Sequence, residues 1–286
     1  MTNNYMNNSE NAMIEKKNFL LPEMAAGDFT NDDLADDLEG MQLSFQRVKI
    51  PGGGMLQFEI PGDNPEEPDY VKTIEGIIVY SHLNNAYWAE GMEYDDNATP
   101  LCSSLDGKVG CGSPGGTCAT CSLNKFGTAT DANGKPAKGK ACKNMRSLYV
   151  LRNGDAMPIL LSLPPTSLTP YKEFANACFL MKNRPLYTGL VQIGLKRVEG
   201  ANAYSIATFK KLRDFVGEEL MQVKAYALTF REQIKMLNQM RADDARNRAE
   251  AEPFFEDGLY SSSENGAHFE ITSTDVLDGD KDELPM

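Results

Sequence analysis

Histidine and tryptophan are scarce in this sequence. Its 286 residues contain two histidines, His82 and His268, and one tryptophan. Zinc deaminases keep an open coordination position on the metal and place a His-x-Glu motif beside it. Neither histidine begins such a motif next to the cysteines, and His268 lies in a segment that we expect to be a tail. A zinc-dependent nuclease or deaminase is therefore disfavoured, and we expect a protein that is not an enzyme.

The sequence also lacks long apolar runs. None approaches the ~18–20 residues that a membrane span requires. The N-terminus lacks the basic-then-apolar pattern of a secretory signal peptide. We therefore expect a cytoplasmic protein with no membrane partner. In a reducing cytoplasm, clustered cysteines favour a bound metal over disulfides.

Five of the six cysteines lie in one short segment, from Cys102 to Cys142. Cys118 and Cys121 form a Cys-x-x-Cys knuckle surrounded by turn-forming glycines and prolines, and its two thiolates can bind one metal ion. A tetrahedral set of four thiolates is typical of structural Zn²⁺, because it leaves no position for water or substrate. Cys118, Cys121 and Cys142 are the expected ligands, and the spacing leaves the fourth open between Cys102 and Cys111. The alternative is a group of unligated, reduced thiols.

The net charge of −13 is unevenly distributed along the chain. Residues 1–107 carry 5 Lys or Arg against 20 Asp or Glu, residues 108–213 carry 16 against 4, and residues 214–286 carry 7 against 17. A basic central stretch between acidic ends indicates a surface that attracts phosphates and releases counterions on binding. The alternative is a solvated face whose lysines only aid solubility.

The hydrophobic pattern predicts a series of short strands. Alternating or β-branched segments predict strands over 41–50, 55–60, 72–81, 146–152, 157–163, 186–198 and 204–210. Asn84 and Asn85 predict a turn that leads the third strand into a hairpin with 86–90.

Two helices are expected between and after these strands. One covers 170–182, with Thr169 as its N-cap, and a longer one covers 215–249, where apolar residues recur at three-to-four spacing. Several short strands with one helix before the last two fit an OB-fold-like small barrel, in a mainly β (α+β) class. The zinc module, residues 100–143, would be a loop inserted between barrel strands. The sequence leaves open whether the last helix packs on its own barrel or on a second copy in a homo-oligomer.

Acidic segments flank the expected domain. Residues 1–40 are rich in Asn and acidic residues, and residues 251–286 are acidic. Neither segment can bury enough apolar surface to offset chain entropy, so both are expected to be disordered. The nucleic-acid-binding domain is therefore expected to span residues 41–250.

Basic and aromatic side chains are interleaved through the central stretch. Small barrels that bind single strands combine a basic groove with aromatics that stack on bases. For any one of the aromatics, a place in the hydrophobic core is the alternative. The candidates for nucleic-acid contact are Trp88, Lys138, Lys140, Lys143, Arg146, Tyr149, Arg152, Lys196 and Arg197.

The last residues form a second specific pattern, an acidic run that ends in an apolar-Pro-apolar tip. A basic-rimmed apolar pocket on a partner protein would hold such a tip while the acids steer its approach. The pattern resembles the tail with which bacterial single-stranded-DNA-binding proteins recruit replication and repair enzymes, although the tip here is Met rather than Phe. The alternative is an unspecific solvating end. The candidate partner-binding residues are Asp282, Glu283, Leu284, Pro285 and Met286.

Motifs within residues 98–210 resemble a zinc-containing family of bacteriophages and integrative elements. They are Gly115–Cys121, Lys125–Gly127, Gly139–Asn144, Arg146–Leu151 and Leu163–Leu168. The members are regarded as single-stranded-DNA-binding proteins and often accompany recombination functions. The resemblance implies a protein of the bacterial host cytoplasm. It also implies a Zn²⁺ site made by Cys102, Cys118, Cys121 and Cys142, with Cys111 as a departure from the family pattern.

Two functions from different classes follow from these features. The first is a non-catalytic protein that coats single-stranded DNA in phage or mobile-element replication and recombination, and whose tail recruits partner proteins. The second is a zinc-bearing adaptor or inhibitor that binds a host protein through its acidic surface. Binding to oligonucleotides with steep salt dependence and single-strand preference would favour the first.

Overall fold

The computed structural model describes residues 19–22, 45–64, 67–88, 100–130, 134–155, 157–200 and 203–251. The expected N-terminal segment, apart from 19–22, and the expected tail, apart from Ala251, lie outside these residues. The elements are β1 (Arg47–Lys49), β2 (Phe58–Asn64), β3 (Glu67–Val71), β4 (Thr73–Tyr87), β5 (Cys102–Ser104), β6 (Val109–Gly112), β7 (Gly116–Thr117), η1 (Ser122–Asn124), β8 (Ala129–Thr130), β9 (Pro136–Ala137), β10 (Lys143–Leu151), β11 (Ile159–Leu163), α3 (Pro165–Cys178), η2 (Leu180–Lys182), η3 (Leu186–Thr188), β12 (Gly189–Val198), β13 (Tyr204–Asp214) and α4 (Gly217–Ala251).

A nine-stranded mixed sheet forms the framework. Its order is β1-β11-β10-β4-β5-β6-β7, and the β12–β13 hairpin joins it by pairing β12 with the first part of β4. β1 runs parallel to β11, whereas β10 is antiparallel to both of its neighbours. The predicted mainly β class and the C-terminal helix are confirmed. Among the described strands no pairing joins β1 to β13, so no closed barrel is formed there and the predicted OB-fold is not confirmed.

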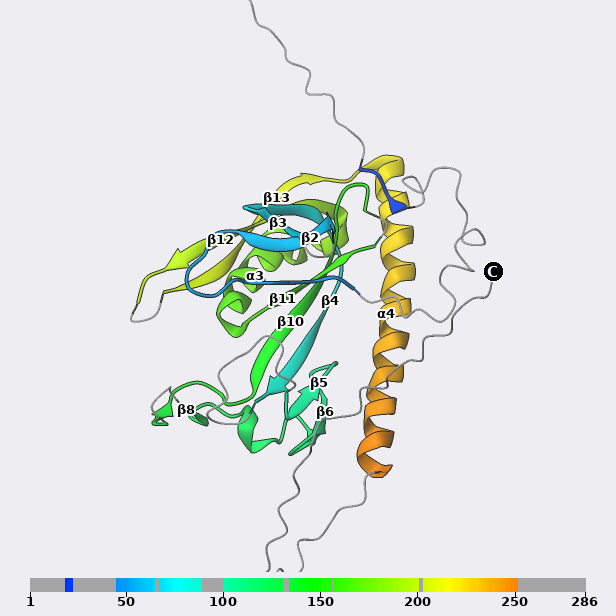
Figure 1. Cartoon of the computed structure of the whole chain (residues 1–286). Coiled ribbons are helices and arrows are strands. Elements are labelled where there is room, and N and C mark those ends of the chain that lie inside the picture. Colours follow the sequence, from blue (N-terminus) through cyan, green and yellow to red (C-terminus); the bar gives the residue numbers. More distant parts are fainter. Residues whose placement is uncertain are drawn as a thin grey trace, which may run out of the picture. The chain divides into compact units, whose positions relative to one another are not determined.

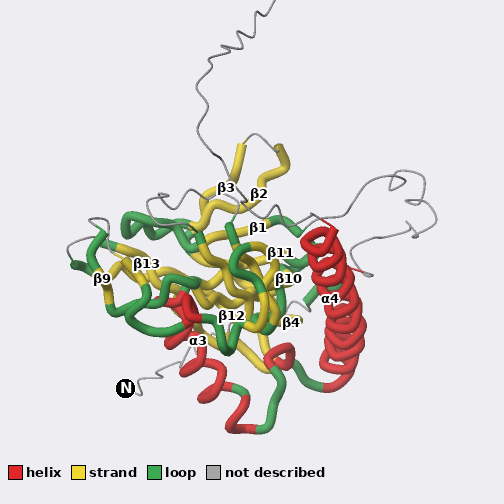
Figure 2. Tube along the Cα trace, turned by 90° about the horizontal axis from the view of Figure 1, so that it is seen from below, coloured by secondary structure: helices red, strands yellow, loops and turns green. Residues whose placement is uncertain are grey.

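The sheet lies between α3 and α4 (Figures 1 and 2). Each of these helices contributes to one of two hydrophobic cores. On β10, Leu148 and Val150 belong to the core that includes α3, whereas Tyr149 and Leu151 belong to the core that includes α4. Successive side chains of a strand point to opposite faces, so a strand buried on both sides is apolar at every position. The apolar run of β10 therefore marks the centre of the fold.

The long helix α4 packs against its own sheet. Val223, Ala227, Phe230 and Ile234 recur at three- and four-residue spacing and are buried against the sheet together with Tyr149. Burying a large apolar side chain contributes about 1.5–3 kcal/mol, so this face fixes the helix more strongly than intrinsic propensity does. None of the described helices is both long enough and apolar enough to cross a membrane.

β4 continues through the position where the sequence predicts a turn, so the expected hairpin with 86–90 is wrong. Asn85 is buried in the strand, accepts a hydrogen bond from Asn144 Nδ2 (2.7 Å) and donates one to the Gly107 carbonyl (3.3 Å). These bonds satisfy an amide that otherwise competes with the strand by favouring turns. The extended end of β4 then pairs with β5 and carries the cysteine-rich module.

α3 begins earlier than expected, at Pro165 with Pro164 as its N-cap, so the predicted cap at Thr169 is wrong. Proline is well suited to the first helical position because its missing N–H needs no partner there. In the first turn, the buried Ser167 hydroxyl accepts a hydrogen bond from the Ala207 amide of β13 (3.0 Å). A bond to a distant strand therefore anchors the start of this helix.

Candidate metal centre and nucleic-acid interface

A tight hairpin positions the first cysteine of the cluster. Asp106 and Gly107 turn β5 into β6, and Gly107 has a positive φ of 71°, as expected for an Asp-Gly turn. Asp106 Oδ1 accepts hydrogen bonds from the Lys108 amide (2.7 Å) and the Val109 amide (3.1 Å). Burial alone would raise the pKa of Asp106, but these donors lower it. The ionised turn residue thus stabilises the hairpin that carries Cys102.

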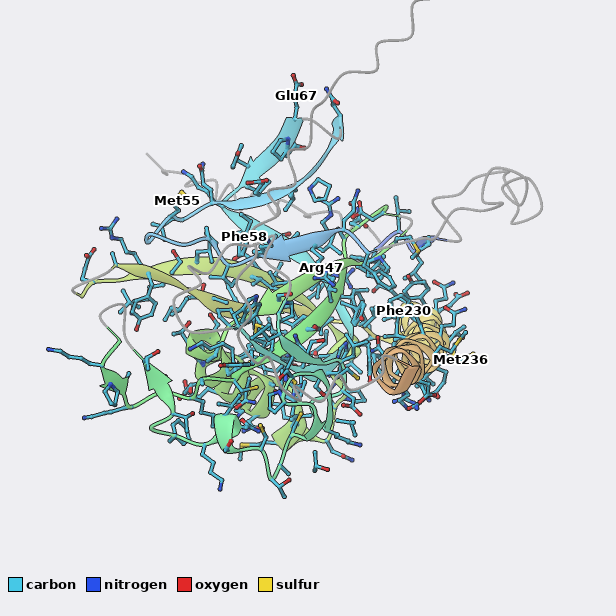
Figure 3. The ribbon with its side chains drawn as sticks, turned by 60° about the horizontal axis from the view of Figure 1, so that its bottom comes forward. Arg47, Met55, Phe58, Glu67, Phe230 and Met236 are labelled. Atoms are coloured by element: carbon cyan, nitrogen blue, oxygen red, sulfur yellow. The ribbon has the colours of Figure 1, made fainter. Side chains whose placement is uncertain are left out.

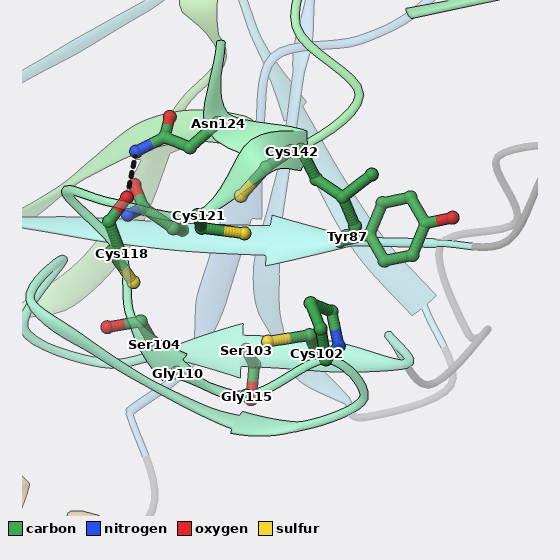
Figure 4. Close-up of a pocket in the computed structure, with 13 residues that line it drawn as sticks. Tyr87, Cys102, Ser103, Ser104, Gly110, Gly115, Cys118, Cys121, Asn124 and Cys142 are labelled. Atoms are coloured by element: carbon green, nitrogen blue, oxygen red, sulfur yellow. Dashed lines mark hydrogen bonds between the residues drawn. The ribbon is translucent and has the colours of Figure 1, made fainter. Parts of the chain in front are cut away.

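Hydrogen bonds also shape the knuckle formed by Cys118 and Cys121. The backbone amide of Asn124 donates to the Cys121 carbonyl (3.2 Å). Its side-chain Nδ2 donates to the Cys118 carbonyl (2.8 Å; Figure 4). Cys142, one residue before β10, donates its own amide to a carbonyl of η1 (2.9 Å). The knuckle and the start of β10 are therefore joined through the backbone.

The cysteines that the family resemblance favours come together around one small cavity. Figure 4 shows their sulfur atoms pointing into the same space. The cavity has a volume of about 10 Å³, roughly one water-sized sphere. It therefore has room for a single ion but not for a substrate. The cysteines that line it are Cys102, Cys118, Cys121 and Cys142.

Strand register separates Cys111 from this cavity. In the β5–β6 pair, Cys102 lies opposite Gly112 and Ser103 lies opposite Cys111. Because neighbouring residues of a strand face opposite sides, Cys102 and Cys111 point away from each other. On the side of Cys102, a Cβ added at Gly110 would lie only 2.9 Å from Cys102 Sγ. Gly110 therefore leaves room for the sulfur, and Cys111, although described, is not among the lining residues.

The thiols around the cavity affect one another's ionisation. Burial, and then the proximity of Cys118, Cys102 and Cys121, raise the pKa of the Cys142 thiol to about 11. Burial also raises the pKa of Cys102, against a hydrogen bond from the Gly115 amide that lowers it. Neighbouring thiolates repel one another. A cation bound in the cavity would offset this repulsion and displace the protons of the cysteine thiols.

The donor set fits a thiophilic ion such as Zn²⁺, which four thiolates bind tetrahedrally. Within the described ranges, no group of three or more His, Cys, Asp or Glu side chains is arranged so that it could hold a metal ion. The four thiols surround the cavity and would have to close in to reach the Zn–S distance of about 2.3 Å.

A second candidate site begins on β1, on the side that faces away from the core containing Val48 and α3. Arg47 and Lys49 flank the buried Val48 on β1 and therefore share one face. The parallel pairing with β11 places Lys49 beside Ser162, and Ser162 lies beside Ser147 of β10. β11 and β10 therefore continue the face of the sheet on which Arg47 and Lys49 lie.

A groove of about 1430 Å³ opens on this face, and we call it the basic groove. Figure 3 shows two of its lining residues, Arg47 on β1 and Met55 on the loop before β2. Tyr70 of β3 also lines it and is 62 % exposed. Its charged lining residues are Arg47, Lys49, Lys72, Lys143 and Glu59. Pockets for small molecules measure about 300–1,000 Å³, so the groove is large enough for a segment of a polymer.

The structure describes all nine predicted nucleic-acid residues. Of the nine, Lys143 alone lines the basic groove. Lys138 and Lys196 are exposed, and Trp88 is half-buried just after β4. Tyr149 is 4 % exposed, because the rings of Phe45, Tyr80 and Phe230 pack around it, so it is not available to stack on a base.

The remaining four predicted residues have partners within the protein. Arg146 donates to the Ser81 hydroxyl (2.9 Å), and Lys140 Nζ donates to side-chain oxygens of two asparagines. Arg152 and Arg197 each form an ion pair with a nearby acid. The partners of the two ion pairs are Asp155 and Glu199, respectively.

Sequence reasoning missed Arg47, Lys49 and Lys72 because they belong to the strongly acidic first third of the chain. The pattern of β1 nevertheless contained a signal. Arg47 and Lys49 alternate with an apolar residue in a segment predicted as a strand. Side chains two residues apart in a strand share one face, so this pattern predicts that both cations lie on the same face.

The candidate partner-binding residues Asp282, Glu283, Leu284, Pro285 and Met286 lie outside the described residues. No known family model, curated protein or solved structure matches this chain.

Proposed function

We propose that this chain is a non-catalytic protein that binds single-stranded DNA. The basic groove carries the proposal, because it combines four cations, a single carboxylate and the exposed Tyr70 in a space suited to a polymer. Phosphates would contact the cations while bases stack on the aromatic ring. The net charge of −13 does not oppose this, because salt screens distant charges beyond about 8–10 Å.

In this proposal a Zn²⁺ ion held by Cys102, Cys118, Cys121 and Cys142 has a structural role. It would hold β5 and the knuckle together with the start of β10, and four thiolate ligands would leave no open coordination position on the metal for catalysis. Lys143 follows Cys142 directly and lines the basic groove. The metal would therefore also fix one of the cations that face the DNA.

The motif resemblance supports a place in phage or mobile-element replication and recombination, in the cytoplasm of a bacterial host. The acidic C-terminal tail would recruit partner proteins of those processes through its Leu284–Met286 tip. OB-fold topology stays a prediction, and the proposal does not depend on it. An open sheet face with a basic groove can bind a single strand in the same way.

The test is a fluorescence-polarisation titration with labelled oligo-dT and a duplex of equal length across a salt series. We expect preference for the single strand and a binding constant that falls linearly with salt on logarithmic axes. The double variant Arg47→Ala/Lys72→Ala should reduce that slope by about 0.7 for each lost phosphate contact.

The matched control is Lys172→Ala, which removes an exposed lysine of α3 that lies outside the groove. Its affinity and slope should equal those of the wild type. If zinc-loaded protein fails to bind oligo-dT even in dilute buffer, the proposal is wrong and the adaptor interpretation becomes the better one.

A further inference from the structure

The cysteine-rich module displays one aromatic ring to solvent. Phe126 is 81 % exposed and lies in the turn between η1 and β8. Lys125 beside it and Lys138, whose carbonyl accepts a hydrogen bond from the Gly127 amide (3.2 Å), are exposed as well. A large side chain this open contributes little to the core, and its ring is accessible to a binding partner.

Hydrogen bonds fix the turn that carries Phe126. Gly127 has a positive φ of 84° and donates its amide to the Gly139 carbonyl (2.9 Å). The Thr128 hydroxyl lies 2.7 Å from the Lys125 carbonyl and accepts a hydrogen bond from the Ala141 amide (3.0 Å). The ring is therefore presented on a rigid support between two candidate metal ligands in the sequence, Cys121 and Cys142.

A held cation lies over the same ring. Lys140 Nζ is 5.1 Å from the centre of the Phe126 ring and donates to the side-chain oxygens of Asn124 (3.1 Å) and Asn144 (2.8 Å). Both acceptors are neutral amides. These acceptors do not neutralise the cation that lies over the ring, and the cation–π contact restricts the ring's orientation.

The ring is also connected to the basic groove through two lysines. Lys143, a lining residue of the groove, donates through Nζ to the Lys140 carbonyl (3.3 Å). Lys140 in turn covers Phe126. The Lys140 cation and the exposed ring are therefore linked through adjoining side chains to a residue that lines the groove.

We propose that Phe126 is a base-stacking site, on which an unpaired nucleobase of single-stranded DNA packs while Lys125 and Lys138 contact the flanking phosphates. The inference rests on the proposed function and adds a second contact point to the basic groove. The Phe126 ring is held in place, with Lys140 over it and further lysines beside it. It therefore offers the two properties that sequence-independent single-strand binding requires, an aromatic face for a base and positive charge along the path of the backbone. A paired base in a duplex has no free face to offer, so duplex DNA would not use this site.

The test compares Phe126→Ala, Phe126→Trp and the control Met181→Ala in oligo-dT titrations. Met181 of η2 is 83 % exposed and lies outside both candidate sites. Loss of one stacked base should weaken single-strand binding about 5- to 150-fold in Phe126→Ala. Phe126→Trp should bind like the wild type, Met181→Ala should be unchanged, and the salt slope should be retained in all three. Zinc content and thermal unfolding verify that each variant is folded.

A second measurement locates the contact directly. Oligo-dT carrying one 5-iododeoxyuridine is irradiated in complex with the protein, and mass spectrometry identifies the crosslinked peptide. We expect the peptide that contains Phe126, and we expect the crosslink to be lost in Phe126→Ala. If Phe126→Ala binds oligo-dT as the wild type does while Arg47→Ala/Lys72→Ala binds it more weakly, the stacking site is refuted and the proposed function stands. If the wild type does not bind, the proposed function itself fails.

Discussion

At the scale of single residues, the register of the β5–β6 pair decides which of two cysteines, Cys102 or Cys111, faces the cavity. Spacing in the sequence leaves Cys102 and Cys111 equivalent. The register that pairs Ser103 with Cys111 turns Cys111 to the other side of the hairpin. Gly110, which has no side chain, leaves the space that Cys102 Sγ occupies. The choice of ligand therefore depends on an alternation that spacing alone does not show.

This geometry predicts different effects for two serine substitutions. Cys102→Ser should weaken zinc binding by more than about 100-fold, because changes outside the ligand set already cost about 10–100-fold. Cys111→Ser, the matched control, should retain the metal. Zinc content after dialysis against a chelator, measured by mass spectrometry, distinguishes the two. Equal loss in both variants, or loss in Cys111→Ser alone, would show that the ligand assignment is incorrect.

At the scale of elements, β4, β10 and α4 meet at His82. Its Nδ1 lies 3.1 Å from the Leu83 carbonyl, and its Nε2 lies 3.3 Å from Tyr149 Oη and 3.4 Å from Asn238 Nδ2 of α4. With the proton on Nδ1, Nε2 can accept the hydrogen bond from Asn238. Burial lowers the pKa of His82, so the neutral ring is favoured in the folded protein. A protonated ring would instead turn an N–H toward the Asn238 donor.

Acid should therefore weaken the packing of α4 through His82. The unfolded histidine has a pKa of about 6.5, so below that pH the unfolded state takes up the proton first. The stability present above pH 6.5 is lost as the pH falls toward the lower folded pKa, by about 1.4 kcal/mol for each unit of difference. Urea unfolding between pH 7.5 and 5 measures the effect.

The comparison for this prediction is His82→Gln, which keeps hydrogen-bonding capacity but does not titrate. Its free energy of unfolding should depend less on pH over the same range than that of the wild type. Identical pH dependence in the two proteins would rule out His82 as the titrating group.

At the scale of the whole molecule, the distribution of charge on the folded protein differs from its distribution along the sequence. Arg184 and Lys211 both contact Asp214 (3.2 and 3.0 Å), and Arg213 pairs with Glu219 (2.6 Å). The acidic final third thus supplies partners for several cations of the basic stretch. The basic groove instead takes three of its four cations from the acidic first third.

The acidic tail gives a prediction at this scale. Residues 254–286 contain nine Asp or Glu and one Lys, and under the proposed function they would compete with DNA for the cations of the groove. Deleting them should raise affinity for oligo-dT at low salt by on the order of tenfold, with a smaller gain at high salt because screening weakens the competition. Fluorescence polarisation measures the change.

The control for the deletion is a tail of the same length in which the nine acids are replaced by the corresponding amides. It should reproduce the gain if charge is the cause. Unchanged affinity in both proteins would remove the tail from any role in regulating DNA binding.

Local pattern was sufficient to predict the mainly β class and the long C-terminal helix. These properties depend on side-chain periodicity and on spacing over a few residues, both of which can be read along the chain. The expected turn at Asn84 and Asn85 failed because partners more than twenty residues away satisfy Asn85.

Only the tertiary structure decided that Cys102 faces the cavity, that Tyr149 is buried, and that Arg47 and Lys72 line one groove with Lys143. Each of these depends on which strands pair and in which register, because a shift of one residue moves a side chain to the opposite face of a sheet. That register is set by packing among strands far apart in the sequence, on both faces of β10.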